Sequence, residues 1–419
     1  MQSDLEVADV FLDGVNSFLR QYGRRHSPEQ HKVLRAITRC RTAELGGQVQ
    51  FCHDCGHQRI QYHSCRNRHC PKCQAMARAA WVDQREAELL PVPYFHVVFT
   101  LPQQLAPLAL QNKRVLYGIL FRAAAQTLQE LAQHPKHVGA NIGILMVLHT
   151  WGQNLMHHPH VHSVVTGGGI SPDGSRWVSC RQTRAGKPFF IDVKILSRVF
   201  RGKFICLLKQ AFVKGELQFY GQLTEFAEAP AFEQLLNSAV KNDWIVHAKR
   251  PFGGPQQVLR YLARYTHRVA ISNQRLLDLK DGQVRFQYKD YADEQRSKTM
   301  TLSSGEFIRR FLMHTLPSRF VRIRYFGILA NRFRKQRLDQ SRTLLGISPQ
   351  APVSANQLPT STTGGDEQDA MSTCPVCRRG RLLIMELPAA HAVRPPHFLR
   401  TLRHTRPQIP GSGRSPPHL

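Results

Sequence analysis

The sequence predicts an α+β protein built on a sheet that carries helices on one face. Short β-rich runs cover residues 94–101, 142–150 and 160–166, and a long stretch rich in Leu and Ala, residues 107–134, separates the first two. A strand, a helix and two further strands in this order are typical of such a sheet. The chain of 419 residues is also long enough for two domains with appendages.

Two helical segments precede the predicted sheet. Ser27, followed by Pro28 and three residues on by Gln30, is typical of a helix start. Residues 74–90 contain no Gly or Pro and are rich in strong helix formers, so we expect a helix that ends before Pro91. A helical cap and a cysteine-rich module therefore fill residues 1–90.

The later segments complete the predicted organisation. They comprise helices over 194–210 and 233–240, a strand within 244–253 and two strands between 276 and 302. A basic segment with interleaved aromatic side chains, 307–335, closes a second domain, 91–345. A linker rich in Ser, Thr, Gln, Pro and Gly covers 346–373. The basic, Pro-rich tail, 374–419, is predicted to be disordered apart from one C-x-x-C pair.

The chain is strongly basic. It has 57 Lys and Arg against 29 Asp and Glu, which leaves a formal charge of +28. A surface this positive needs a polyanionic partner such as nucleic acid. No run of about 18 apolar residues occurs, so no membrane-spanning helix is expected. The acidic opening residues are unlike a signal peptide, and in the reducing cytoplasm that we therefore expect, cysteines bind metal rather than form disulfides.

Two C-x-x-C pairs, Cys52 with Cys55 and Cys70 with Cys73, are separated by fourteen residues. Each such turn delivers two sulfurs to one ion, so the pairs predict one structural zinc on four thiolates. A catalytic zinc of the nucleobase-deaminase type is excluded, because no H-x-E with its glutamate precedes the pairs. Further cysteines and histidines lie nearby in the sequence, so two alternatives stay open: one of them replaces a cysteine ligand, or a second ion is bound. These residues are Cys40, Cys65, His57, His63 and His69.

The run HHPHVH at residues 157–162 is the densest chemical signal. In an extended strand, His160 and His162 point to one face about 6 to 7 Å apart, which lets both imidazoles bind one cation. Val161 then points into the core. The alternative for an isolated H-x-H motif is that both histidines only pack.

Two tyrosines four residues apart add to this signal. Helical spacing puts Tyr261 and Tyr265 on one face, about 6 Å apart. Alone, this spacing favours an aromatic core stripe, but three neighbouring arginines favour a phosphodiester cleft. They are Arg260, Arg264 and Arg268. No P-loop is present, because Pro188 stands where Ser or Thr belongs. Rejoining DNA without ATP requires stored bond energy, which a tyrosyl phosphodiester supplies.

Five segments carry a resemblance to a known family: FCHDCGH, SCRNRHCPKCQ, YFHVVFTLP, HHPHVHSVVTGGG and YLARYTHRVAISN. Together they resemble the rolling-circle insertion-sequence transposases, the bacterial family numbered ninety-one, in the two-tyrosine HUH endonuclease superfamily. The resemblance covers residues 20–335. It implies an antiparallel palm-like sheet, an N-terminal transposase zinc-binding domain and cleavage of single-stranded DNA at the ends of a mobile element.

The resemblance also implies roles for individual residues. His160 and His162 are similar to the HUH metal pair, which holds Mg²⁺ or Mn²⁺. Tyr261 and Tyr265 are similar to the two nucleophiles, which form a 5′-phosphotyrosine. Nothing in the sequence orders the two, and we slightly prefer Tyr261 for the first cut.

The third ligand of the catalytic metal varies in enzymes of this kind. Gln153, in the turn before the histidine strand, is our preferred candidate. The alternatives are His149, at the end of the preceding strand, and His96, on the first strand.

The C-terminal tail lies outside the resemblance. Its pair, Cys374 and Cys377, has no obvious second pair, and whether it binds metal is open. His391 and His397 are the candidate additional ligands.

The resemblance predicts a transposase that nicks and rejoins single-stranded DNA at element ends and target in rolling-circle transposition. Its location is the bacterial cytoplasm, at the nucleoid. We expect the zinc module and residues 307–335 to bind DNA by phosphate contacts and base stacking. Two other classes stay open: a non-catalytic zinc-module nucleic-acid-binding protein, and a metal-dependent nuclease that uses water as the nucleophile.

Overall fold

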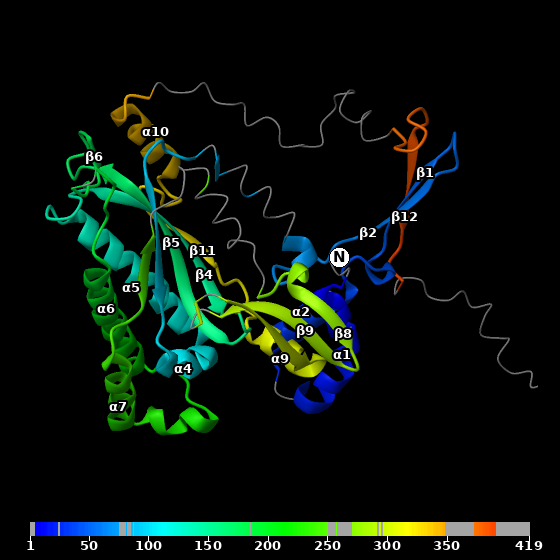
Figure 1. The fold of residues 1–419 in the computed structure, drawn as a ribbon, viewed down its shortest axis with the longest axis horizontal. Coiled ribbons are helices and arrows are strands. Elements are labelled where there is room, and N and C mark those ends of the chain that lie inside the picture. Colours follow the sequence, from blue (N-terminus) through cyan, green and yellow to red (C-terminus); the bar gives the residue numbers. More distant parts are fainter. Residues whose placement is uncertain are drawn as a thin grey trace, which may run out of the picture. The chain divides into compact units, whose positions relative to one another are not determined.

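A computed structural model describes most of the chain, and its architecture is mixed α+β with antiparallel sheets, as predicted (Figure 1). The described residues are 5–23, 26–74, 81, 85–86, 88–184, 186–249, 257, 270–290, 293–294, 296–347 and 373–390. The chain divides into two compact units, Met1–Thr38 with Cys65–Thr362 and Arg39–Ser64 with Thr363–Leu419. These limits differ from the boundaries at residues 90 and 345 that the sequence suggested. None of the described helices is long and apolar enough to cross a membrane.

The larger unit is built on an antiparallel sheet with the strand order β11-β4-β5-β3-β7, and β6 pairs with β5. The strands are β3 (Tyr94–Thr100), β4 (Asn141–Trp151), β5 (His157–Ile170), β6 (Trp177–Ser179), β7 (Val246–Lys249) and β11 (Ile323–Gly327). The strands predicted over 94–101, 142–150 and 160–166 are confirmed as β3, β4 and β5. The last of these begins earlier than predicted, at His157.

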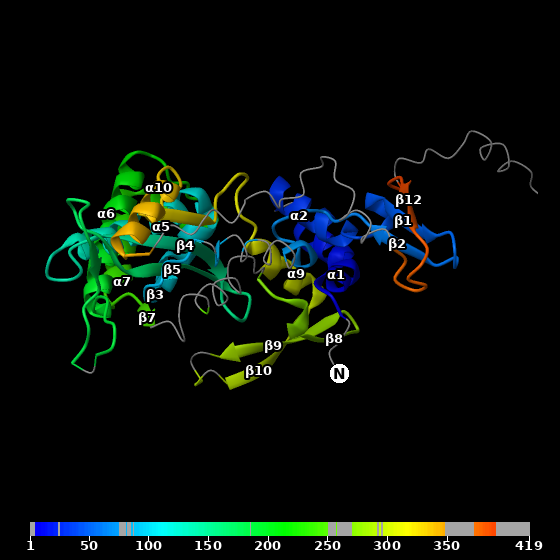
Figure 2. The same ribbon diagram turned by 90° about the horizontal axis from the view of Figure 1, so that it is seen from above.

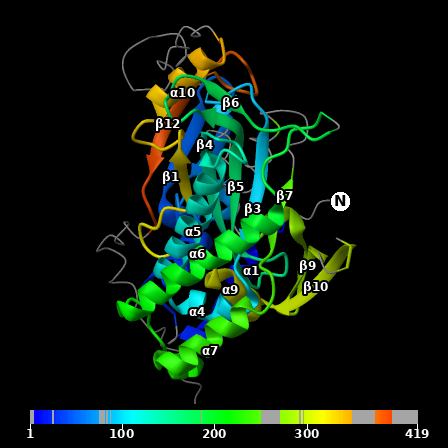
Figure 3. The same cartoon turned by 90° about the vertical axis from the view of Figure 1, so that its left-hand side faces the viewer.

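Four helices form one layer against this sheet (Figure 3). They are α4 (Ala106–Gln111), α5 (Lys113–Gln133), α6 (Val193–Val213) and α7 (Ala229–Val240). The core between the layers contains the fully buried rings of Phe99, Phe121 and Phe200. Phe99 lies on β3, whereas Phe121 and Phe200 lie on α5 and α6, so this core joins the sheet to its helical layer.

The helix predicted over 107–134 is interrupted at Asn112. Its side-chain amide donates to the carbonyls of Leu108, at 3.2 Å, and Gln218, at 2.8 Å, and its side-chain oxygen accepts from the Gln218 N–H. An Asn side chain that bonds to the main chain competes with helical hydrogen bonds. The two resulting helices are α4 and α5.

The opposite face of the sheet also carries a helix, α10 (Arg334–Leu344). Leu338 of α10 packs with Tyr94, Leu145 and Val164, which lie on β3, β4 and β5. The expectation that helices cover only one face is therefore wrong. Because side chains alternate along a strand, His162 and His160 share the face of Val164.

The first helix packs against a segment almost 300 residues later (Figure 2), and the second is hydrogen-bonded to that segment, from Gln30 Nε2 to the Leu312 carbonyl. Phe11 of α1 (Val7–Tyr22) meets Phe311 of α9 (Ser304–Met313), with ring centroids 5.2 Å apart. Helix α2 (Pro28–Arg39) starts with the predicted cap: Ser27 Oγ accepts from the Gln30 N–H, and Gln30 Oε1 accepts from the Ser27 N–H. The N-terminal helices thus belong with α9 rather than to a separate N-terminal cap.

A three-stranded antiparallel sheet of order β10-β9-β8 lies beside α9 (Figure 2). Its strands are β8 (Leu276–Lys280), β9 (Gln283–Asp290) and β10 (Arg296–Ser303). Residues 276–302 therefore hold three strands, where the sequence predicted two. The additional turn, at Asp281 and Gly282, has positive φ at both residues, as a tight hairpin requires.

The smaller unit is a three-stranded antiparallel sheet of order β12-β1-β2. Strands β1 (Gly47–Cys52) and β2 (Gln58–Tyr62) form a hairpin, and β12 (Leu382–Leu387) pairs along the other edge of β1. The described part of the C-terminal tail is therefore ordered, which corrects the expectation of disorder there. Most of the helix predicted over 74–90, and residues 348–372 of the linker, lie outside the described residues.

We expect Gly14→Ala to destabilise the packing of α1 on α9. A Cβ at this position would lie 2.5 Å from the Ser304 Cβ and 2.8 Å from its carbonyl carbon, and overpacking of this kind costs about 1–3 kcal/mol. Urea unfolding of the full chain measures the loss of free energy. Gly118→Ala, in α5, is the matched control, because nothing lies within 4 Å of its Cβ and a helix interior gains roughly 0.5–1 kcal/mol from Ala. Equal effects of the two substitutions would contradict the proposed packing.

Candidate functional site

Three histidines from two neighbouring strands lie together on the α10 side of the central sheet. They are His149 on β4 and His160 and His162 on β5, and a ring nitrogen of each lies within 4.8 Å of the others. Antiparallel pairing places His149 directly opposite His160. The ring centroids of His149 and His162 are 4.5 Å apart. Because imidazole is a common metal ligand, this group, here called the histidine cluster, can hold one cation.

Hydrogen bonds orient two rings of the histidine cluster. His160 Nδ1 donates to the carbonyl of His158 at 2.7 Å, which leaves the lone pair on Nε2. His162 Nδ1 lies 2.9 Å from Nε2 of His96 on β3, and the two rings are stacked. The tautomer in which His162 donates to His96 leaves His162 Nε2 as the ligand atom. A hydrogen-bond partner on the second ring nitrogen of a histidine ligand fixes the tautomer and the orientation of that histidine.

Burial keeps the rings of His160 and His96 uncharged. Desolvation lowers the pKa of His160 to about 4, and the charge of His158 adds to the effect. Desolvation also lowers the pKa of His96 to about 4, with Lys249 and His247 adding to it. These imidazoles are therefore neutral at pH 7, the state that binds a metal ion.

Two further histidines near the cluster bond within the core. The Tyr117 hydroxyl of α5 lies 2.8 Å from His157 Nε2, and His157 begins β5 on the face opposite to His160. His314 donates from Nε2 to the carbonyl of Leu155 at 3.0 Å, and its Nδ1 lies 3.2 Å from Thr150 Oγ1. His157 and His314 therefore fit the alternative in which a histidine only packs in the core.

The sequence-predicted site residues have different outcomes in the structure. His160 and His162 lie together, and His149, the alternative third ligand, completes their group. Gln153 follows β4, and its main-chain carbonyl accepts from the Arg275 guanidinium. Its side chain stays a proposed ligand. The tyrosines and arginines of the second motif lie outside the described residues: Tyr261, Tyr265, Arg260, Arg264 and Arg268.

Part of the basic, aromatic segment 307–335 lies in the core. Phe307, Phe311 and Phe320 are buried, and the Arg324 guanidinium lies 5.1 Å from the centroid of the Phe320 ring. The segment also supplies β11, an edge strand of the central sheet. The prediction that its aromatic side chains stack on DNA bases is wrong for these three rings, because they are not accessible.

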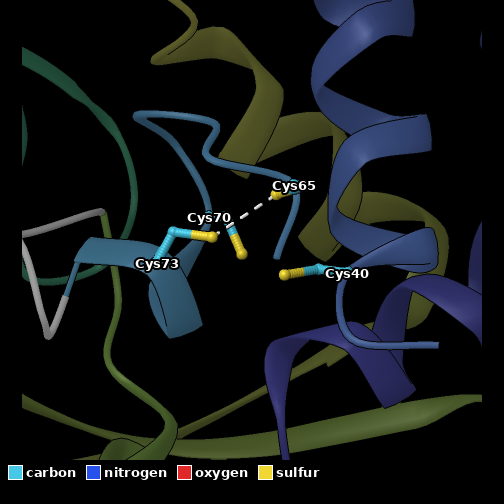
Figure 4. Close-up of side chains that lie close together, drawn as sticks. All are labelled: Cys40, Cys65, Cys70 and Cys73. Atoms are coloured by element: carbon cyan, nitrogen blue, oxygen red, sulfur yellow. Dashed lines mark hydrogen bonds between the residues drawn. The ribbon is translucent and has the colours of Figure 1, made fainter. Parts of the chain in front are cut away.

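The cysteines form two groups, which corrects the single zinc site predicted from Cys52, Cys55, Cys70 and Cys73. Cys70 and Cys73 group with Cys40 and Cys65, and the four Sγ atoms lie within 4.8 Å of one another (Figure 4). Cys52 and Cys55 group instead with Cys374 and Cys377. The prediction failed because β12 pairs with β1, and sequence spacing does not show this pairing. The sequence contained one sign of the second group, the C-x-x-C pair in the tail that has no second pair near it.

The geometry of the first group fits zinc. Tetrahedral zinc with Zn–S bonds of about 2.3 Å separates its sulfurs by about 3.8 Å, and Cys65 Sγ lies 3.6 Å from Cys73 Sγ. A disulfide needs about 2.05 Å. The Asn67 N–H points at Cys65 Sγ at 3.5 Å, and such bonds stabilise a thiolate.

Two family models match the chain. One, described as "Transposase zinc-binding domain", covers residues 10–101, and the other, described as "Putative transposase", covers residues 143–337. The second match contains the whole histidine cluster. The fold and the matches together define the class of protein: a transposase with an N-terminal zinc-binding domain. The first match and the cysteine groups support zinc as a bound metal.

Two relatives give the family. The chain is 50% identical over 396 residues, 92% of this chain and 96% of the relative, to "Putative transposase y4qJ" of Sinorhizobium fredii. It is 30% identical over 320 residues, 75% of this chain and 73% of the relative, to "Transposase for insertion sequence element IS801" of Pseudomonas savastanoi pv. phaseolicola. The chain belongs to the IS91 family of insertion-sequence transposases. No solved structure matches it.

We expect His149→Ala to weaken binding of Mn²⁺ to the full chain. Loss of a hydrogen-bond partner behind a ligand lowers metal affinity roughly 10–100-fold, and loss of the ligand itself should lower the Mn²⁺ affinity by at least as much. Titration followed by Mn²⁺ electron paramagnetic resonance measures the affinity. His134→Ala, an exposed histidine that follows α5, is the matched control and should leave the affinity unchanged. Weakening by Gln153→Ala, and not by His149→Ala, would instead make Gln153 the third ligand.

Proposed function

We propose that this transposase nicks and rejoins single-stranded DNA at the ends of its element through a 5′-phosphotyrosine intermediate. The observation that carries the proposal is the histidine cluster, three imidazoles from adjacent strands of an antiparallel sheet, of which His149 and His162 are buried. The formal charge of +28 suits a DNA substrate. The sheet order supports, by analogy, the palm-like HUH fold. The proposed substrate places the reaction in the bacterial cytoplasm, at the nucleoid.

The cluster has the donors for one divalent cation. When bound, a cation such as Mg²⁺ or Mn²⁺ would polarise the scissile phosphate and stabilise the charge that develops on its oxygens. His149, His160 and His162 offer only nitrogen, and nitrogen donors suit Mn²⁺ better than the hard ion Mg²⁺. A side-chain oxygen of Gln153 would shift this preference towards Mg²⁺.

Tyr261 and Tyr265 are the proposed nucleophiles, on the strength of their four-residue spacing and of the family. The phenolate oxygen of one attacks the phosphorus and forms the tyrosyl phosphodiester. The bond from phosphorus to the 3′ oxygen breaks, and that oxygen takes a proton and leaves as a 3′-hydroxyl. The second tyrosine can then cut another strand before the first bond is resolved. The neighbouring arginines Arg260, Arg264 and Arg268 are the proposed phosphate contacts.

We expect the double substitution of Tyr261 and Tyr265 by Phe to end covalent chemistry. Each single variant should keep some adduct, because either hydroxyl can reach the phosphate, and DNA binding should change little since the rings remain. A labelled single-stranded oligonucleotide with Mn²⁺, run on a denaturing gel, measures the adduct. Tyr325→Phe is the control, because its ring packs under the guanidinium groups of Arg85 and Arg334. An adduct formed by the double variant would remove both tyrosines from the mechanism. Cleavage without an adduct would favour the nuclease.

We expect His160→Ala to abolish cleavage while the affinity for the same oligonucleotide stays about the same. The substitution removes a metal ligand and leaves the basic surface intact, and that surface provides most of the non-specific affinity. Cleavage is measured on the gel and binding by fluorescence anisotropy without added metal. Parallel loss of both in a folded variant would favour the non-catalytic alternative, in which the histidines only pack.

A further inference from the structure

The smaller unit brings together four cysteine thiols from two segments more than 300 residues apart. Cys52 is the last residue of β1 and Cys55 lies in the turn that follows, whereas Cys374 and Cys377 precede β12. The four Sγ atoms lie within 4.8 Å of one another. The zinc-binding domain match ends at residue 101 and therefore does not contain the second pair.

The distances between the sulfurs fit one tetrahedral zinc ion. Cys52 Sγ lies 3.7 Å from Cys377 Sγ, and Cys55 Sγ lies 3.7 Å from Cys374 Sγ. Four sulfurs around zinc, with Zn–S bonds of about 2.3 Å, lie about 3.8 Å apart. Both contacts join one pair to the other, so neither pair forms a site alone. All four cysteines are free thiols.

The two turns share one backbone conformation. In the first, the Gly56 N–H donates to the Cys52 carbonyl at 3.0 Å, and in the second, the Arg378 N–H donates to the Cys374 carbonyl at 2.9 Å. Gly56 and Arg378 each follow the second cysteine of their pair, and each has a positive φ, +70° and +57°. An arginine in this conformation is uncommon. A shared hydrogen bond and a shared positive φ are what two matched metal-binding turns require.

The space beside the sulfurs is kept free by a glycine. A Cβ at Gly380 would lie 2.5 Å from Cys52 Sγ and 2.9 Å from the Asp54 Cβ. The Gly380 N–H donates to Cys377 Sγ at 3.3 Å, a bond that stabilises a thiolate. Gly380 therefore contacts both halves of the group.

The smaller unit has almost no apolar core to hold it together. Its described residues that are buried are only cysteines and glycines: Cys40, Gly46, Gly47, Cys52, Cys374 and Gly380. Large apolar side chains on its strands are exposed instead, among them Ile60 at 54% and Met385 at 58%. A sheet this small is stable in water only with a further constraint, such as a structural metal.

We propose that Cys52, Cys55, Cys374 and Cys377 bind a second structural zinc ion, which joins the C-terminal C-x-x-C pair to the N-terminal hairpin as one zinc ribbon. The four cysteines bind as thiolates, so each thiol that is still protonated releases its proton to water as the ion enters. The ion holds β12 in register on β1, where Leu382 pairs with Cys52. The ribbon can form only after the C-terminal segment has been synthesised. The proposal is independent of the DNA chemistry and goes beyond it.

Zinc content of the full chain, purified with a reductant, tests the proposal. Cys374→Ser and Cys377→Ser should each lower the zinc content by about one equivalent per chain relative to the unsubstituted protein. The double variant with Cys52→Ser and Cys374→Ser should lose the same single equivalent, because both ligands belong to one ion. Cys206→Ser is the matched control, since Cys206 is an exposed thiol of α6 outside both cysteine groups, and it should lose none.

Gly380→Ala keeps all four ligands and tests the geometry without removing a thiol. The added methyl group should lower zinc occupancy at this site, whereas Gly202→Ala, in α6, should leave it unchanged because its Cβ meets nothing within 4 Å. Full zinc content in Cys374→Ser, or losses that add in the double variant, would overturn the proposal. Because the readout is zinc content, it does not depend on whether the protein cleaves DNA by the proposed route.

Discussion

The antiparallel pairing of β4 with β5 is the contact on which the candidate active site depends. It places His149 opposite His160, and strand alternation puts His162 on the same face. No loop has to close to bring these three rings together. Because both strands lie inside the central sheet, flanked by β11 and β3, their register is held by hydrogen bonds along both edges. A ligand set on such rigid elements is held more precisely than a set on loops.

The face that carries the cluster explains its chemistry. The other face of the sheet is packed against α4 to α7, and its strand side chains, such as Val161 and Phe99, are core residues. On the cluster face, α10 packs on Leu145 and Val164. Leu145 lies two side chains from His149 along that face of β4, and Val164 is the next side chain after His162 on β5. Burial thus keeps His160 neutral, and the three histidines lie on the face of the sheet opposite to its larger apolar core. The contact between His96 and His162 suits a positioning role for His96 in the proposed metal site, because it lies on the side of His162 away from the proposed ligand atom.

The second cysteine group, Cys52, Cys55, Cys374 and Cys377, solves a different physical problem. The larger unit has an extended apolar core, whereas the smaller unit buries only cysteine and glycine among its described residues. Hydrophobic burial cannot stabilise a sheet of this size, so bonds between sulfur and metal provide the stability. The same reasoning explains the position of Gly380, where a side chain would displace the Cys52 sulfur. It also explains why a segment read as a disordered tail contains a strand.

The sequence by itself determined the features that depend on local pattern. Short β-rich runs located β3, β4 and β5, the Ser27 cap located α2, and the H-x-H spacing put His160 and His162 on one face of a strand. Thiol spacing likewise predicted metal-binding turns at Cys52 with Cys55 and at Cys70 with Cys73, and left the role of Cys374 with Cys377 open. Only the tertiary structure decided which distant segments meet: β4 against β5 for His149, β12 against β1 for the second cysteine group, and α1 against α9. The physical reason is that a strand edge or a thiolate pair accepts any partner with suitable geometry. The choice among partners is made by the packing of the whole chain, which local spacing does not encode.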